Sequence, residues 1–177
     1  ILTSTLFARR NASIWSPIEA RSAWLIDVAK TILAHPEPGF QEVTTARLVS
    51  EKLHELGIAH DTGLALTGIK GYIRGGKPGP TVAVIGELDS LRVPGHPHAT
   101  PDTGAAHACG HHCQIAMMLG AAVGLKALEG QAALAGNIAL MAVPAEEFID
   151  VQYRWHLHQE GKLGLMAGKQ ELIRLGA

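Results

Sequence analysis

The stretch Thr81–Asp89, with the sequence TVAVIGELD, decides the fold of this chain. Its first five residues are almost continuously apolar and rich in β-branched side chains, which predicts a strand buried on both faces of a sheet. Two acids, Glu87 and Asp89, follow where the strand ends. Open α/β sheets place their ligands at the carboxyl ends of their strands. The stretch therefore predicts an α/β fold with a candidate site at this end of the strand.

Patterns on both sides of this strand predict alternating helices and strands. We expect helices over residues 17–34, 42–56 and 109–128, strands over 69–73, 81–85 and 137–143, and a short helical segment at 170–175. Glycines and prolines between residues 74 and 80 are a strong turn signal, so the first two strands are expected to form a hairpin. This alternation predicts an α/β sandwich.

The composition of the chain excludes several classes of protein. The chain has 177 residues, of which 47% are hydrophobic and 18% charged, with a net charge of -1, so we expect one soluble domain that binds neither nucleic acid nor membrane. The longest apolar run is interrupted by Gly120, Gly124 and Lys126. Two cysteines form no disulfide framework, which favours a reduced, cytoplasmic setting. Residues 1–16 are expected to be an N-terminal extension of a domain spanning residues 17–177.

Metal-binding residue types gather in two places. The first is His107–Cys113, with the sequence HACGHHC, and the second is Pro144–Glu147, with the sequence PAEE. Cysteine, histidine and glutamate are ligands that zinc and similar divalent metals accept, and a spare carboxylate beside them serves metal-assisted hydrolysis as a base. These segments indicate a metallohydrolase.

The chain resembles the metal-dependent amidohydrolases of the aminoacylase and carboxypeptidase clan, in the branch that contains aminobenzoyl-glutamate hydrolases. The matching segments are His35–Glu42, Gly79–Ala83, Gly86–Leu91, Ala106–His112 and Pro144–Glu147. The resemblance implies a three-layer sandwich with a mostly parallel mixed sheet. It also implies hydrolysis of an amide bond in an N-acyl amino acid, a dipeptide or an aminobenzoyl-glutamate-type substrate, with two divalent ions, manganese or zinc, in the complete enzyme.

The same resemblance implies roles for single residues. Cys109 would bridge two cations, His111 and Glu147 would each bind metal, and Glu146 would be the general base. Asp89 would orient a ligand or the base, or else cap a turn. His112 would contact substrate or cap its helix.

A different class of function stays open from the residues alone. Cys109, His111 and Cys113 are spaced closely enough for a structural zinc site in a non-catalytic module. Such a closed site would not need Glu146 and Glu147. A cysteine hydrolase built on Cys109 lacks an evident Asn or Asp partner.

Relatives of this kind extend further than this chain. They supply further histidine ligands and carry an inserted α+β domain that often dimerises. We therefore expect the N-terminal part of a catalytic domain, with an incomplete set of metal ligands and without the inserted domain, from a complete protein that forms a homodimer.

Overall fold

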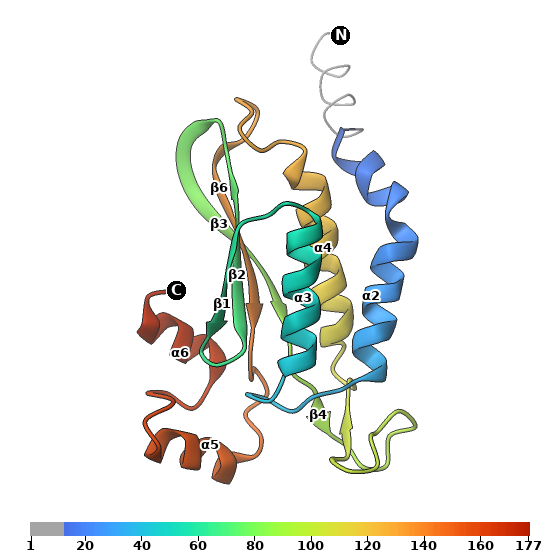
Figure 1. Ribbon diagram of the computed structural model, residues 1–177, viewed down its shortest axis with the longest axis vertical. Helices are drawn as coiled ribbons and strands as arrows, with labels where there is room; N and C mark the ends of the chain where they lie inside the picture. Colours follow the sequence, from blue (N-terminus) through green and yellow to red (C-terminus); the bar gives the residue numbers. More distant parts are fainter. Residues whose placement is uncertain (1–12) are drawn as a thin grey trace.

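The computed structural model describes residues 13–177, which form a mixture of helices and strands (Figure 1). Residues 13–20 are helical, and the labelled elements that follow are α2 (Ser22–Ala34), α3 (Val43–Glu55), β1 (His60–Leu64), β2 (Gly68–Arg74), β3 (Lys77–Glu87), β4 (Leu91–Arg92), β5 (Ala105–Ala106), α4 (His111–Lys126), β6 (Ala135–Val143), α5 (Val151–Gln159) and α6 (Gly168–Leu175). Within residues 13–177, no helix has the length and apolar content to cross a bilayer.

The N-terminal helix begins earlier than expected. Residues 13–20 are already helical, and Arg21 breaks the helix before α2. Of the expected extension, residues 1–12 lie outside the described part of the chain.

Four strands form a mixed sheet in the order β1-β2-β6-β3. β1 and β2 pair antiparallel, β2 and β6 pair antiparallel, and β3 and β6 pair parallel. The expected mixed α/β architecture is confirmed. Parallel pairing does not predominate among the described strands, since one of these three pairings is parallel.

The expected hairpin is wrong, because β6 lies between β2 and β3. The N–H groups of Gly75 and Gly76 bond to carbonyls of residues 131–136 instead of closing a tight turn. β6 is buried along nearly its whole length, so burial favours the central place in the sheet for this strand. The turn signal correctly indicates a chain reversal but does not identify the pairing partner.

The prediction that residues 81–85 are buried on both faces of the sheet is also wrong. β3 is an edge strand of the described sheet, and Val82 and Ile85 are 55% and 52% exposed. Only the end of β3, at Gly86 and Glu87, is buried. The site end of this strand is therefore the part that the fold encloses.

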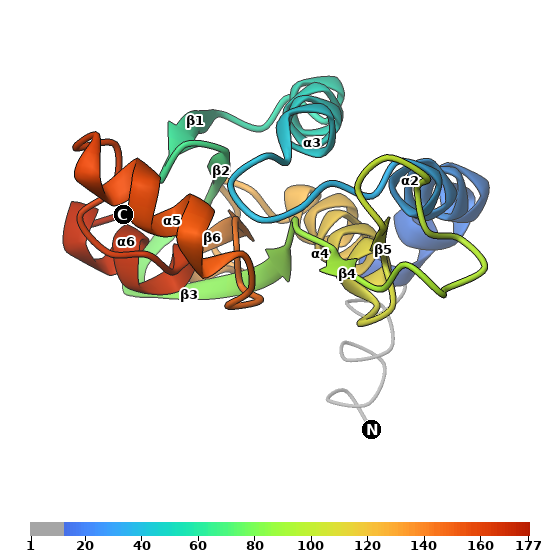
Figure 2. The same ribbon diagram turned by 90° about the horizontal axis from the view of Figure 1, so that it is seen from below.

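Helices cover both faces of the sheet (Figure 2). α3 and α4 pack on one face, with α2 packed against α4, over a core that includes Ile32, Leu53, Ile69 and Leu119. α5 and α6 lie on the other face, over a smaller core that contains Phe40, Met141, Leu157 and Leu172. The three-layer arrangement is confirmed, with the second helical layer confined to one end of the sheet (Figures 1 and 2).

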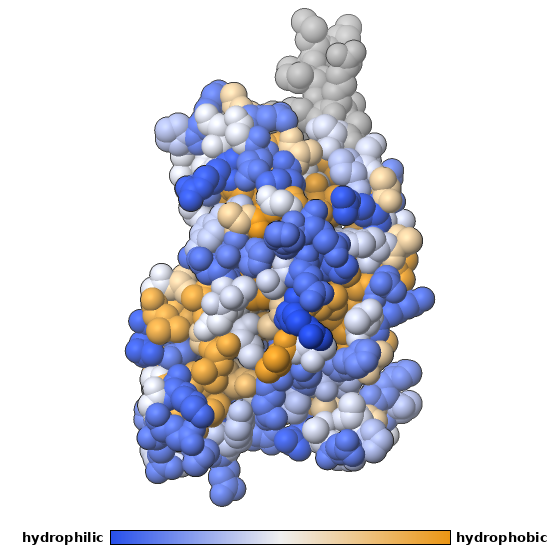
Figure 3. Space-filling model, viewed as in Figure 1, coloured by the Kyte–Doolittle hydropathy of each residue, from blue (hydrophilic) through white to orange (hydrophobic). Residues whose placement is uncertain are grey.

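α3 is an amphipathic helix at the expected place. Val49 and Leu53 are fully buried, while its outward face is polar, with apolar surface on either side of it (Figure 3). Gly57 follows the helix with φ +63°, and Ile58 N–H bonds back to the carbonyl of Leu53. A left-handed residue with such a bond is a common helix ending, and glycine adopts it at little cost.

The carboxyl ends of β3 and β6 and the N-terminus of α4 lie in the lower half of the molecule in Figure 1. These three ends carry Glu87 and Asp89, Glu146 and Glu147, and Cys109 and His111. Residues that are far apart in the sequence are thereby brought to one edge.

Candidate metal centre

His111 is fixed by a backbone contact. It lies in the first turn of α4, is 1% exposed, and its Nδ1 donates a hydrogen bond to the carbonyl oxygen of Asp89 over 2.8 Å. Because a carbonyl oxygen only accepts, Nδ1 carries a proton, so the proton that the ring gives up on binding a metal is the one on Nε2. The contact thus prepares Nε2 as a ligand atom.

Three carboxylates surround Nε2 of His111. Oε2 of Glu87 lies 3.0 Å from this nitrogen, Oε1 of Glu147 lies 3.8 Å away and Oε2 of Glu146 lies 3.9 Å away. In the described part of the chain, the atoms fall into two overlapping groups, each within 4.8 Å: Cys109, His111 and Glu147, and Glu87, His111 and Glu146. The three predicted metal ligands therefore do lie together.

Cys109 precedes α4 instead of lying in its first turn. Helix α4 begins at His111, two residues later than expected, because Gly110 has φ +96° and interrupts the helical backbone. A hydrogen bond to Glu147, followed by burial and the charges of nearby carboxylates, raises the pKa of the Cys109 thiol. A neighbouring cation would reverse this effect and favour the thiolate.

The turn that carries Glu146 and Glu147 is held from several sides. Oε1 of the buried Glu42 accepts a hydrogen bond from Ala145 N–H at 2.7 Å, and Oδ2 of Asp89 accepts one from Glu147 N–H at 3.0 Å. Ala145 has φ +48°, a strained conformation for a residue with a Cβ. These contacts offset the strain and fix the direction of both carboxylates.

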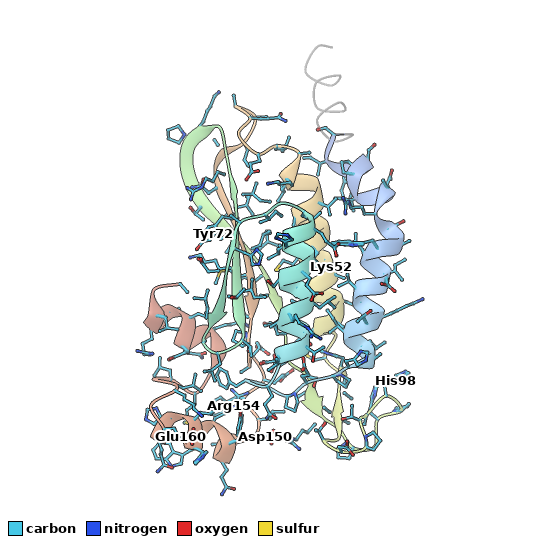
Figure 4. All side chains as sticks on the ribbon, in the orientation of Figure 1. Lys52, Tyr72, His98, Asp150, Arg154 and Glu160 are labelled. Carbon is cyan, nitrogen blue, oxygen red and sulfur yellow. The ribbon has the colours of Figure 1, made fainter. Side chains whose placement is uncertain are left out.

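Arg154, in α5, binds the carbonyl side of the same turn (Figure 4). It is 1% exposed and donates to the carbonyl oxygens of Ala145, Ile149, Met166 and Glu147. Its guanidinium also lies over the ring of Phe40, at 5.2 Å from the centroid. A Cβ at Gly39 would lie 2.7 Å from the guanidinium of Arg154, so a side chain there would displace the guanidinium from its partners. Sequence reasoning did not identify Arg154, because its partners come from separate loops.

The negative charge of the surrounding carboxylates changes the pKa of His111. Burial by itself lowers the pKa of His111, but hydrogen bonds to Asp89 and the charges of Asp89 and Glu87 outweigh it and raise the pKa to about 9. Lys169 adds a second positive group, with Nζ bonded to Glu87 and Glu146. The sequence placed Glu87 at the strand end where the site was expected but gave it no role. Lys169 was not among the expected site residues, and no local pattern indicates it.

The residues present fit a divalent cation. A thiol, an imidazole nitrogen and carboxylate oxygens within 4.8 Å are the donor types that zinc and manganese accept. Glu87, Glu146 and Glu147 converge on one nitrogen, and a divalent cation would add to the charge of Lys169 in offsetting the repulsion among these carboxylates. Cys109, His111 and Glu147 would hold such an ion.

Other expected residues lie outside these ligand groups. His112 is partly exposed, and its ring packs 5.5 Å from that of the buried His107, centroid to centroid. Burial, with the charges of His112 and His111, lowers the pKa of His107 to about 4. Cys113 lines an apolar groove beside Leu25 and Met117. The alternative zinc site of Cys109, His111 and Cys113 is therefore not assembled in the described structure.

Comparison with known proteins matches the segment around the site to a peptidase family. Residues 83–167 match the model of Peptidase family M20/M25/M40. This part of the chain belongs to that family. The matched M20 segment contains both ligand groups, from Glu87 to Glu147.

Individual relatives agree with the M20 assignment. The chain is 41% identical over 128 residues to IAA-amino acid hydrolase ILR1-like 6 of Arabidopsis thaliana, covering 71% of this chain and 27% of that protein. It is 39% identical over 132 residues to thermostable carboxypeptidase 2 of Saccharolobus solfataricus, covering 70% of this chain and 32% of that protein. The chain thus spans about a third or less of the length of the curated relatives it matches.

A solved structure of a family M20 peptidase has a similar fold. The chain superposes on a dinuclear metal-binding peptidase of family M20 from Bacillus subtilis with a TM-score of 0.64 and 29% identity, over 81% of this chain and 40% of that one.

Proposed function

We propose that the protein containing this chain is a metal-dependent amidohydrolase. Its substrate would be an N-acyl amino acid, a dipeptide or an aminobenzoyl-glutamate-type conjugate, and two divalent ions, manganese or zinc, would serve the complete enzyme. The observation that carries the proposal is the convergence of Cys109, His111 and Glu147 within 4.8 Å, with Glu146 beside them. Relatives named as an amino acid conjugate hydrolase and a carboxypeptidase support this class of substrate.

Each residue of the centre has a separate task in the proposed reaction. A divalent ion bound there would polarise the amide carbonyl and acidify water at the site. Glu146 takes the proton from the attacking water and passes it to the leaving nitrogen. Asp89 is a positioning residue, because its carbonyl oxygen fixes the ring of His111 and its carboxylate holds the backbone N–H of Glu147.

Glu146→Gln in the complete protein tests the proposal. Glutamine keeps the size of the side chain but does not accept the proton, so turnover should fall roughly a hundredfold or more while bound metal is retained. The assay follows hydrolysis of N-acetyl amino acids and aminobenzoyl-glutamate with added manganese or zinc, with and without a chelator. Glu160→Gln, at the exposed end of α5, is the matched control. Near-normal turnover of Glu146→Gln, or turnover that resists the chelator, would refute the mechanism.

A homodimer of the complete protein is also proposed. It rests on the resemblance to enzymes whose inserted domain often dimerises, and the mass of the complete protein in solution tests it.

A further inference from the structure

Lys169 brings a positive charge to one side of the ligand cluster. Its Nζ donates to Oε1 of Glu87 over 2.5 Å and to Oε1 of Glu146 over 3.2 Å. The other oxygen of each carboxylate faces Nε2 of His111, at 3.0 Å and 3.9 Å. Lys169 thus holds the outer oxygens of the two acids while their inner oxygens point to the imidazole.

The helix that contains Lys169 does not explain this placement. α6 begins at Gly168, so Lys169 lies in its first turn. The N-terminus of a helix carries partial positive charge, which disfavours a cation there. The contacts with Glu87 and Glu146 compensate for that position, which indicates that the acids determine where the ammonium lies.

The two ligand groups compete for one nitrogen. Both contain His111, whose Nδ1 is already bonded to the carbonyl oxygen of Asp89. Nε2 has one lone pair and binds one cation, so that cation is completed either by Cys109 and Glu147 or by Glu87 and Glu146. Lys169 bonds to both acids of the second pair. A divalent ion on that side would therefore be repelled by an ammonium group a few ångströms away.

We infer that Lys169 directs the divalent cation to Cys109, His111 and Glu147 by holding Glu87 and Glu146 as partners of its own ammonium group. The inference rests on the proposed metal centre and gives Lys169 a positioning role in it. A second cation then requires Lys169 to release the two acids. Its side chain is 43% exposed, which leaves it room to move.

Cobalt titration of the 177-residue chain tests the inference. Cobalt bound to a thiolate shows a charge-transfer absorption, and equilibrium dialysis measures the total cobalt bound. Lys169→Met removes the charge and keeps most of the side chain, so the thiolate absorption per bound cobalt should fall. Lys169→Arg keeps the charge and should behave as the wild type. Lys162→Met is the matched control, since Lys162 pairs with the exposed Glu160.

A second comparison starts from a chain without the thiol. Cys109→Ser should weaken cobalt binding, and adding Lys169→Met should restore roughly tenfold or more of the affinity, because the acids are freed from a nearby positive charge. Adding Lys162→Met should restore none. Circular dichroism checks the fold of each variant, and Lys169→Gln replaces Lys169→Met if the methionine disturbs it.

The outcomes separate the inference from the proposed function. Unchanged thiolate absorption in Lys169→Met, with no gain in the Cys109→Ser background, would overturn the role of Lys169 and leave the metal centre intact. Wild-type affinity in Cys109→Ser alone would overturn the metal centre itself. A wild-type chain that binds no cobalt would overturn both.

Discussion

Glu42 should make the free energy of unfolding of the chain fall as the pH rises from 4.5 to about 7. Burial raises the pKa of Glu42 to about 7 from an ordinary value of 4.5, and hydrogen bonds from Thr67 and Ala145 offset only part of this. Between these two values the native state keeps a proton that the unfolded state has released, so the free energy of unfolding decreases as pH rises. The difference corresponds to about 3 kcal/mol, fully lost once the pH exceeds about 7.

Glu42→Gln isolates this contribution. Glutamine does not ionise, and its amide can still accept from Ala145 N–H and bond to Thr67 Oγ1, the two partners of Glu42. The variant should match the wild type near pH 4 and exceed it by up to about 3 kcal/mol at pH 8. Urea unfolding across this range measures the difference. Glu51→Gln, an exposed position on α3, is the control and should show none. A difference between Glu42→Gln and wild type that does not change with pH would refute the reasoning.

Two other substitutions probe the surroundings of the centre. Asp89→Ala should lower metal affinity about 10- to 100-fold, because it removes the carboxylate that accepts from Glu147 N–H while the backbone carbonyl that holds His111 remains, and equilibrium dialysis measures the loss; unchanged affinity would mean that the Asp89 carboxylate does not position Glu147. Gly168→Ala should cost roughly 2 kcal/mol or more in urea unfolding, since its Cβ would lie 1.6 Å from the carbonyl oxygen of Pro144, whereas Gly95→Ala, with no atom within 4 Å, should be neutral. Equal stability of these two glycine variants would contradict the close packing of α6 on the turn.

Local patterns were sufficient to predict much of the fold and the main ligand group. The spacing of its apolar residues and Gly57 predicted α3, and the apolar run before Pro144 predicted β6. Cys109, His111 and Glu147 lie at the ends of elements whose convergence the α/β alternation predicts.

Long-range contacts were not predictable in the same way. In the sequence Arg154 is one more polar residue in a short helix, yet it binds carbonyls of two separate segments, the turn at residues 145–149 and Met166. Lys169 follows a glycine with no local sign that it reaches Glu87, which lies 82 residues earlier. The order of the strands in the sheet depends on which strand gains most from burial. The turn signal at residues 74–80 carries no information on the burial of a strand. Residue types and spacing therefore indicate the ligands, whereas the residues that position them depend on the folded structure.

Metal content after dialysis tests the centre most directly. The wild-type chain, Cys109→Ala and Cys113→Ala would each be loaded with zinc or manganese, dialysed and measured by elemental analysis. The wild type and Cys113→Ala should retain metal, because Cys113 lies in the apolar groove, and Cys109→Ala should lose most of it while staying folded. Equal metal content in Cys109→Ala and wild type, or loss of metal in Cys113→Ala, would contradict a centre built on Cys109, His111 and Glu147.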